Sequence, residues 1–247
     1  MRIEEDHLTL VKLERQLTWT QPDNAIVDFA RYDRKLLKKG TVKKVTIREG
    51  RIVKAKDMEL FLFTDMLMYA KPIRLKKPPF MRYEVRDQFK RAYVKFKEHP
   101  DVGDKMNGKY LMDACITGEE GEYPIHFRAD SDVERARWLE AFNDRGTDVE
   151  GVYGAYDCPE VEVLRDYDAI DSDALSIRVG QRYKILENRE GWKRGYNAAY
   201  QPNSRLNPIG WIPADYVCDV ENDHSDARRR RERHRDQARL GAEESDI

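Results

Sequence analysis

Four residues in the carboxyl-terminal half of the chain have the types and the spacing of an apolar binding groove. They are an aromatic residue, a tryptophan, a proline and a second aromatic residue: Tyr167, Trp192, Pro213 and Tyr216. Brought together from distant segments, such side chains form a shallow groove that suits a ligand already extended as a polyproline II helix, because little chain entropy is then lost on binding. The pattern therefore predicts that the chain recognises a peptide segment.

The segments around these residues follow one another in a characteristic order. They are 164–169, 173–177, Gly191-Trp192 and the run Gly210-Trp211-Ile212-Pro213-Ala214-Asp215-Tyr216-Val217. This ordered set resembles the Src-homology-3 (SH3) domain. The resemblance implies a small β-barrel over residues 161–220 and a proline-rich ligand.

Two positions depart from the SH3 pattern. Arg165 stands where the family usually has a second groove tyrosine, and Ala174 stands where an acid usually pairs with a basic residue of the ligand. Asp171 and Asp173 are candidates for that acidic role. An atypical or intramolecular partner therefore stays open beside an ordinary proline-rich ligand.

The charge of the chain is strongly polarised along the sequence. The formal net charge is −1, yet residues 31–110 hold 23 Lys/Arg against 10 Asp/Glu, and residues 111–187 hold 8 against 19. Such a chain orients in an external field, and an anionic membrane surface is the commonest such field in a cell.

The basic residues of the first predicted hairpin are candidates for binding anionic lipid. They are Lys38, Lys39, Lys43, Lys44, Arg51, Lys54 and Lys56. Phosphate recognition needs several cations that converge on one point. Because side chains alternate along a strand, only about half of these can face one pocket. The residues predict weak lipid attachment, with a solvated surface or a contact to a neighbouring domain as the alternatives.

Short runs of period two follow one another from about Tyr32. The sequence predicts strands at 36–45 and 51–54, an apolar strand pair at 59–70 with Asp65 in its turn, and strands at 82–85, 92–96, 110–116 and 123–128. A helix is predicted at 131–142, because Ser131 followed by Glu134 is a capping box. Five of its apolar residues are expected on one face that closes the barrel: Val133, Ala136, Trp138, Leu139 and Phe142.

A strand series closed by a helix that carries a tryptophan resembles the pleckstrin-homology (PH) domain. The segments that carry the likeness are 60–67 and 134–138, and they look most like the PH domains of Dbl-type Rho guanine-nucleotide exchange factors. A PH domain followed closely by an SH3 domain narrows the resemblance to the ephexin subgroup. The fold class implied is mainly β, with a seven-stranded PH-type barrel capped by a carboxyl-terminal helix and followed by an SH3-type barrel.

The resemblance also implies a division of the chain. Residues 1–30 are expected to be a helical remnant of an exchange domain, 31–146 the PH domain, 147–160 a linker, 161–220 the SH3 domain and 221–247 a charged, disordered tail. The amphipathic segment 8–17 supports either of two interpretations, the last turns of a longer helix or a helix that caps the next domain.

The tail contains two further motifs. Seven arginines lie between Arg228 and Arg239, interleaved with acids, and indicate a solvated segment that is helical or disordered. Ser245 and Ile247 place a hydroxyl two positions before an apolar carboxyl terminus, which fits capture by a PDZ domain. No RNA-reading module accompanies the arginines, so the expected partners exclude nucleic acid.

The sequence offers no arrangement for catalysis and no cofactor. Its three cysteines and five histidines are dispersed, so we expect neither a metal site nor a disulfide framework. No signal peptide or membrane span is apparent, and a cytoplasmic, membrane-peripheral protein is expected.

Together these features predict a regulatory module for protein interaction and membrane association in small-GTPase signalling, without its own catalytic domain. A Rho GTPase would then be reached only through the missing exchange domain. A stand-alone SH3 adaptor and direct nucleotide exchange on a Rho GTPase are the alternatives.

Overall fold

The computed structural model describes residues 2–20, 25–26, 28–32, 34–102, 108–142, 158–199 and 208–245, without the side chains of 2–3 and 239–245. The chain divides into two compact units, Met1–Phe142 and Asn143–Ile247, which we call the first and the second unit. The expected linker at 147–160 lies almost wholly outside the described residues.

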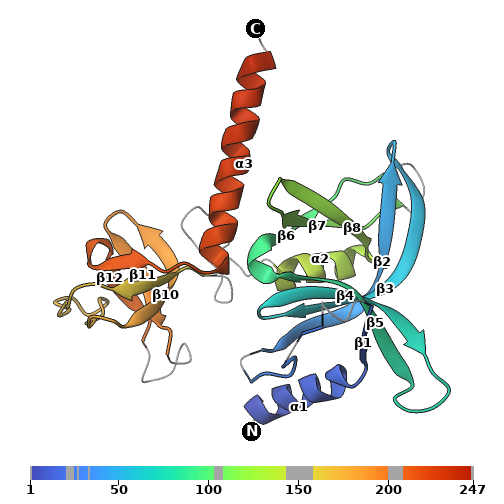
Figure 1. Cartoon of the computed structure of the whole chain (residues 1–247), viewed down its shortest axis with the longest axis horizontal. Coiled ribbons are helices and arrows are strands. Elements are labelled where there is room, and N and C mark those ends of the chain that lie inside the picture. The colour runs from blue at the N-terminus through green and yellow to red at the C-terminus, as the bar shows by residue number, and fades with distance from the viewer. Residues whose placement is uncertain are drawn as a thin grey trace. The chain divides into compact units, whose positions relative to one another are not determined.

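The first unit is built on one eight-stranded sheet (Figure 1). Its elements are α1 (Arg2–Glu14), β1 (Leu17–Trp19), β2 (Leu36–Arg48), β3 (Arg51–Phe63), β4 (Met66–Arg74), β5 (Met81–Lys90), the 3-10 turn η2 (Arg91–Tyr93), β6 (Val94–Glu98), β7 (Leu111–Thr117), β8 (Glu122–Arg128) and α2 (Asp132–Phe142). The predicted strand segments and the closing helix are confirmed, except that 51–54 and the first strand of the apolar pair form one continuous strand, β3. Strand β1 adds a further strand parallel to β5. The sheet order is β1-β5-β4-β3-β2-β8-β7-β6. Since these pairings leave the order open at both ends, a closed barrel stays a prediction.

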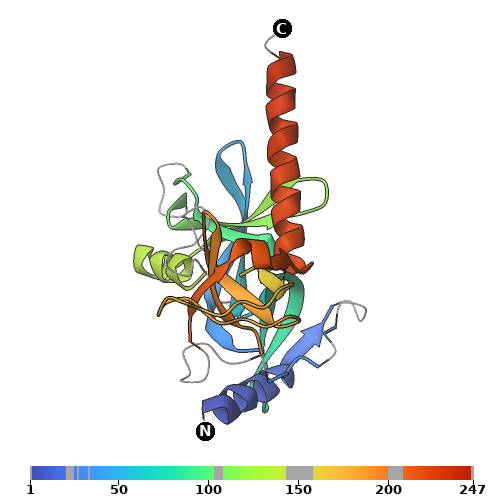
Figure 2. The same cartoon turned by 90° about the vertical axis from the view of Figure 1, so that its left-hand side faces the viewer.

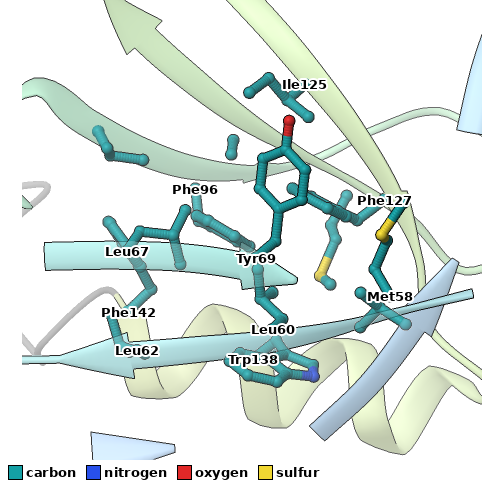
Figure 3. Close-up of a cluster of buried hydrophobic side chains, with 14 of the residues drawn as sticks. Met58, Leu60, Leu62, Leu67, Tyr69, Phe96, Ile125, Phe127, Trp138 and Phe142 are labelled. Carbon is teal, nitrogen blue, oxygen red and sulfur yellow. The ribbon is translucent and has the colours of Figure 1, made fainter. Parts of the chain in front are cut away.

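Residues 58–63 of β3 and 66–70 of β4 lie in the part of the sheet that is buried on both faces, which explains their continuous apolar sequence. One face contributes Leu60, Leu62 and Tyr69 to a cluster with Trp138 and Phe142 of α2 (Figure 3). The other face contributes to a second cluster that includes residues of α1, β1 and β5. Asp65 lies between the two strands, as predicted.

Helix α2 begins as the capping box predicts and buries its tryptophan. The backbone N–H of Glu134 donates to Oγ of Ser131 over 3.2 Å, and the Trp138 side chain is 1% exposed. A Cβ atom at Gly40 would lie 3.3 Å from the Trp138 ring, so the glycine lets β2 approach the helix closely. The predicted apolar face is partly wrong: Val133 is 59% exposed and Ala136 also faces solvent.

Helix α1 packs on the first unit, as the second of the two interpretations requires. Leu10 and Leu13 are buried in the cluster that covers the outer face of β3 to β5. Near this cluster, buried Arg34 donates to both carboxylate oxygens of Asp65, and its Nη1 atom donates to the Phe29 carbonyl over 2.7 Å. The segment before the sheet is therefore part of the first unit.

The second unit contains a small five-stranded sheet of order β12-β11-β10-β9-β13. Its strands and turn are β9 (Glu160–Val163), β10 (Arg182–Arg189), β11 (Trp192–Asn197), β12 (Gly210–Pro213), the 3-10 turn η4 (Ala214–Tyr216) and β13 (Val217–Asp219). Seven buried residues form its core: Val161, Val163, Ile177, Tyr183, Ile185, Ile212 and Val217.

Of the two states left open for the arginine-rich tail, helical or disordered, the structure has the helix: Asp223–Ser245 form α3 (Figure 2). Asn222 and Ser225 cap its start reciprocally, with hydrogen bonds of 3.0 and 2.9 Å. Ion pairs four residues apart, such as Arg230 with Asp226, stabilise the next turns. Among the described residues, no helix is long and apolar enough to cross a membrane.

Candidate functional site

The structure brings the four predicted groove residues of the second unit together. The ring centroids of Tyr167 and Trp192 are 6.2 Å apart and those of Tyr167 and Tyr216 are 5.7 Å apart, both edge to face. Trp192 of β11 lies directly opposite Pro213 of β12 in the strand register. All four side chains are half-buried, so they form one apolar strip that stays accessible from solvent.

Strand alternation explains why these side chains point outward. Ile212 is fully buried, and therefore Pro213, the next residue, lies on the opposite face of β12. Tyr167 is held by a pair of backbone hydrogen bonds with Ile177, of 3.0 and 2.9 Å, while the Ile177 side chain fills the core. Tyr216 follows on η4, which begins immediately after Pro213.

The predicted acidic residues lie on an exposed loop beside the strip. The carbonyl of Asp173 accepts the backbone N–H of Trp211 over 2.8 Å, and a Cβ atom at Gly210 would lie 2.7 Å from the same carbonyl. Gly210 is thus required for the loop to reach β12. Asp171 and Asp173 are both exposed, and Asp168 pairs with Arg178 over 2.6 Å.

Trp211 is a candidate groove residue that the sequence analysis did not select. It lies two residues from Pro213 on β12, hence on the same face, and Ala174 forms a bridge with it. The Arg189 guanidinium lies 4.9 Å from its ring centroid and is held by Glu187 over 2.8 Å. The same alternation that places Pro213 outside could have identified Trp211.

The predicted lipid-binding cations of the first unit are divided between the two faces of β2. Lys38 lies 4.9 Å from the Trp138 ring centroid, and Lys44 donates to Oη of Tyr69 over 2.6 Å. Lys39 lies on the other face and donates to Oη of Tyr83 over 2.6 Å, and Lys43 pairs with Asp57 on that face. The prediction that alternation splits the set is confirmed, and these four lysines contact the first unit itself.

Three predicted cations are left near the far end of the β2–β3 hairpin. Arg51, Lys54 and Lys56 are exposed on β3. Lys56 lies opposite Lys44 and Lys54 lies opposite Thr46 in the register of the two strands. These three residues and Lys39 are the predicted cations that the structure leaves exposed.

The Lys44–Tyr69 contact has electrostatic consequences. Burial lowers the pKa of Lys44, while the nearby Asp87 carboxylate acts in the opposite direction. Burial, reinforced by Asp87, raises the pKa of Tyr69 to about 12. Burial also raises the pKa of Asp87 itself. These shifts indicate a poorly hydrated polar contact rather than an open phosphate site.

The predicted PDZ ligand cannot be placed. Ser245 is the last residue of α3, and its side chain is outside the described set, as is Ile247 entirely.

Comparison with known proteins adds family relationships to this geometry. Residues 31–145 match the family model of the SOS1/NGEF-like PH domain. Ephexin-1 of Rattus norvegicus is 23% identical over 223 residues, which cover 86% of this chain and 30% of that protein. Rho guanine nucleotide exchange factor 16 of Homo sapiens is 23% identical over 168 residues, 64% of this chain and 22% of that protein.

A solved structure is also similar to part of the chain. It is the carboxyl-terminal SH3 domain of myosin IB from Entamoeba histolytica bound to an EhFP10(GEF) peptide, with 34% identity, a TM-score of 0.22, and coverage of 26% of this chain and 95% of that one. The chain spans less than a third of the length of the curated relatives that it matches.

Proposed function

We propose that the chain, which is similar to ephexin-1 and matches the SOS1/NGEF-like PH domain at residues 31–145, is a regulatory interaction module of small-GTPase signalling. In this proposal the second unit is an SH3 domain that binds a proline-rich or intramolecular segment. The PH domain associates weakly with anionic membrane, and a Rho GTPase is engaged through a catalytic exchange domain outside these residues.

The observation that carries the peptide-binding proposal is the convergence of Tyr167, Trp192, Pro213 and Tyr216 on one accessible strip. A polyproline II ligand presents apolar ridges at a three-residue period, and an edge-to-face aromatic strip offers matching hollows. Because the ligand is already extended, the ordering entropy that opposes binding is small.

Substitution of the central tryptophan tests this proposal. We expect Trp192→Ala to weaken binding to an array of proline-rich peptides at least about tenfold, since large aromatic anchors dominate small interfaces. Val179→Ala is the matched control, because Val179 is an exposed apolar residue of the same unit. Equal peptide binding by the parent and the Trp192 variant, with both folded, would show that the strip is not the binding groove.

The membrane proposal rests on Arg51, Lys54 and Lys56 and on the net positive charge of residues 31–110. Each cation at an anionic surface contributes about 1 kcal/mol, so three suffice for transient attachment. Alanine at all three positions should abolish the preference for vesicles that contain phosphatidylserine in a cosedimentation assay. A control with alanine at Lys12, Lys95 and Lys109 removes the same charge elsewhere on the first unit. Sedimentation that is indifferent to lipid charge in the parent would refute the proposal.

The carboxyl terminus adds a smaller proposal. Ser245 and Ile247 would bind a PDZ domain by strand addition and carboxylate capture. Loss of binding to a PDZ panel after deletion of residues 245–247 is the expected result, and unchanged binding would contradict it.

The rival proposal is that residues 1–247 themselves accelerate nucleotide exchange on a Rho GTPase. Its support is the similarity of the chain to ephexin-1 and to Rho guanine nucleotide exchange factor 16. Release of a fluorescent guanine nucleotide distinguishes the two: we expect no acceleration by the purified chain, and a clear acceleration would replace our proposal.

A further inference from the structure

Three potential metal ligands meet on one side of the first unit, although they are dispersed in the sequence. Nδ1 of His99 lies 2.9 Å from one carboxylate oxygen of Asp113, and Nδ1 of His126 lies 2.8 Å from the other. The two imidazole rings are edge to face, with centroids 5.0 Å apart. One ligand atom from each of the three residues lies within 4.8 Å of the other two.

Strand register holds the cluster together. Asp113 of β7 and His126 of β8 are direct cross-strand partners. His99 follows the last residue of β6, and its backbone N–H donates to the Leu111 carbonyl over 3.2 Å, which continues the pairing of β6 with β7. Two of the donors therefore sit on the adjacent strands β7 and β8, and the third stands immediately after the neighbouring strand β6.

The burial of Asp113 makes the cluster chemically unusual. Asp113 is 4% exposed, and an ionised carboxylate at such a position needs a nearby positive charge. Lys97 is the register neighbour of Asp113 on β6, but its ammonium interacts with the thiol of Cys115. Within the described part of the chain, the two imidazoles fill both carboxylate oxygens.

We propose that His99, Asp113 and His126 bind one divalent transition-metal ion of the zinc type. Imidazole nitrogen and carboxylate oxygen are ordinary zinc ligands, and three such ligands leave a coordination position for water or a partner's donor. Ligands on opposite sides of an ion, with bonds of about 2.1 Å, are at most about 4.2 Å apart. The donors are close enough to reach this arrangement by small side-chain rotations. Each imidazole would then carry its proton on Nε2 and present the Nδ1 lone pair to the ion.

Of the three proposed ligands, His99 lines a surface depression, whereas Asp113 and His126 are not part of its lining. The depression, of about 410 Å³, is lined by Glu98, His99, Pro100, Asp101 and Arg135. The carboxylate of Asp101 adds negative charge at this depression, while Arg135 is neutralised by Glu98 over 2.7 Å. The metal would join β6, β7 and β8 through their side chains and so stabilise this half of the sheet.

Zinc binding by the full chain, expressed without a histidine tag, tests the proposal. Competition with a chromogenic zinc chelator should give one zinc ion per chain. We expect His126→Gln and His99→Gln each to lower the affinity at least about tenfold, since even loss of a group that only orients a ligand costs 10- to 100-fold. His224→Gln and the double variant Cys115→Ser/Cys218→Ser are matched controls that should bind like the parent.

A second measurement on the parent keeps the result independent of variant folding. Zinc should shift the imidazole NMR signals of two of the five histidines. One of these two signals should be absent in the His99 variant and the other in the His126 variant. No saturable zinc binding by the parent, equal binding by all variants, or shifts confined to other histidines would each overturn the proposal. The three residues would then form a hydrogen-bonded cluster without a metal.

Discussion

Trp138 of the first unit is 1% exposed and packs among Leu60, Leu62 and Phe142, whereas Trp192 of the second unit is half-buried beside Tyr167. The same residue type thus serves two purposes in one chain. The first unit has two helices that cover both faces of its central strands, so Trp138 and the other aromatic residues of its two clusters are used in packing. The small sheet of the second unit has one core, and its outward aromatic residues stay accessible.

This difference teaches where to look for binding in each unit. An aromatic residue in a buried cluster stabilises the fold and has no apolar surface left in contact with solvent. A half-buried aromatic strip keeps apolar surface that a ligand can cover. In the first unit, the accessible chemistry is therefore carried by charged and imidazole side chains. In the second unit it is carried by aromatic ones.

The largest expected contrast is between the two tryptophans. Trp138→Ala should lower the free energy of unfolding of the first unit by about 3–5 kcal/mol, because it leaves a cavity in the core. Trp192→Ala should cost the second unit about 1 kcal/mol or less. Chemical denaturation of the full chain, followed by hydrogen exchange to assign each transition, measures both. Similar losses for the two variants would break the comparison.

The next contrast is between a buried and an exposed arginine. Arg34 is 4% exposed and bonded to Asp65 and to the Phe29 carbonyl. Arg34→Ala should cost about 2–3 kcal/mol, because the Phe29 carbonyl loses this donor and Asp65 keeps only its pair with Arg31 over 3.0 Å. Arg178 pairs with Asp168 at the surface, where its side chain is 51% exposed and also donates to the carbonyls of Tyr167 and Ile177. Arg178→Ala should leave the denaturation midpoint unchanged, and a loss there equal to that of Arg34 would refute this distinction.

Alkaline pH should destabilise the first unit through Tyr69. Its pKa of about 12 in the folded state exceeds the ordinary value of 10.0, so the folded state binds more protons between these pH values. Stability must then fall as the pH rises above 10. Lys44, whose pKa is lowered by burial, contributes the opposite slope below 10.5. Tyr69→Phe should flatten the decline in urea denaturation between pH 10 and 12; an identical slope in the variant would contradict the assignment.

The smallest expected effects concern the helix caps. Ser131 caps α2 of the first unit, and Ser225 belongs to the reciprocal cap of α3 in the second. Ser131→Ala should lower the stability of the first unit by about 1 kcal/mol. Ser225→Ala should instead reduce the helical circular dichroism signal and leave the transition of the first unit in place. A shift of that transition by Ser225→Ala would show that the caps do not act within separate units.

Local sequence signals predicted much of the fold. The turn at Asp65 and the start of α2 at Ser131 are both confirmed. Each of these two features was predicted from a few residues that lie within four positions of one another. The buried face of α2 was harder to predict, because Val133 is apolar yet 59% exposed. For the tail, the sequence left a helix and disorder open, and ion pairs four residues apart support the helix that the structure shows.

The candidate sites, like the fold, were predictable where the signal is local in the sequence. The four groove residues could be selected from the sequence because each stands in a short, recognisable segment. Trp211 was missed, although strand alternation from Pro213 would have identified it. Strand alternation predicted that about half of the lysines would lie on each face of β2. It could not predict their partners Tyr69, Tyr83 and Trp138, because these lie 25 or more positions away in the sequence.

The sequence by itself determined which segments form strands and helices, because those choices depend on periodicity, caps and turns within a few residues. Only the tertiary structure decided which side chains meet across the sheet. His99, Asp113 and His126 become neighbours because β6, β7 and β8 pair in one register, and a shift of one residue in that register would turn a strand's side chains to the opposite face. Such register depends on the packing of the whole core, which no local pattern encodes.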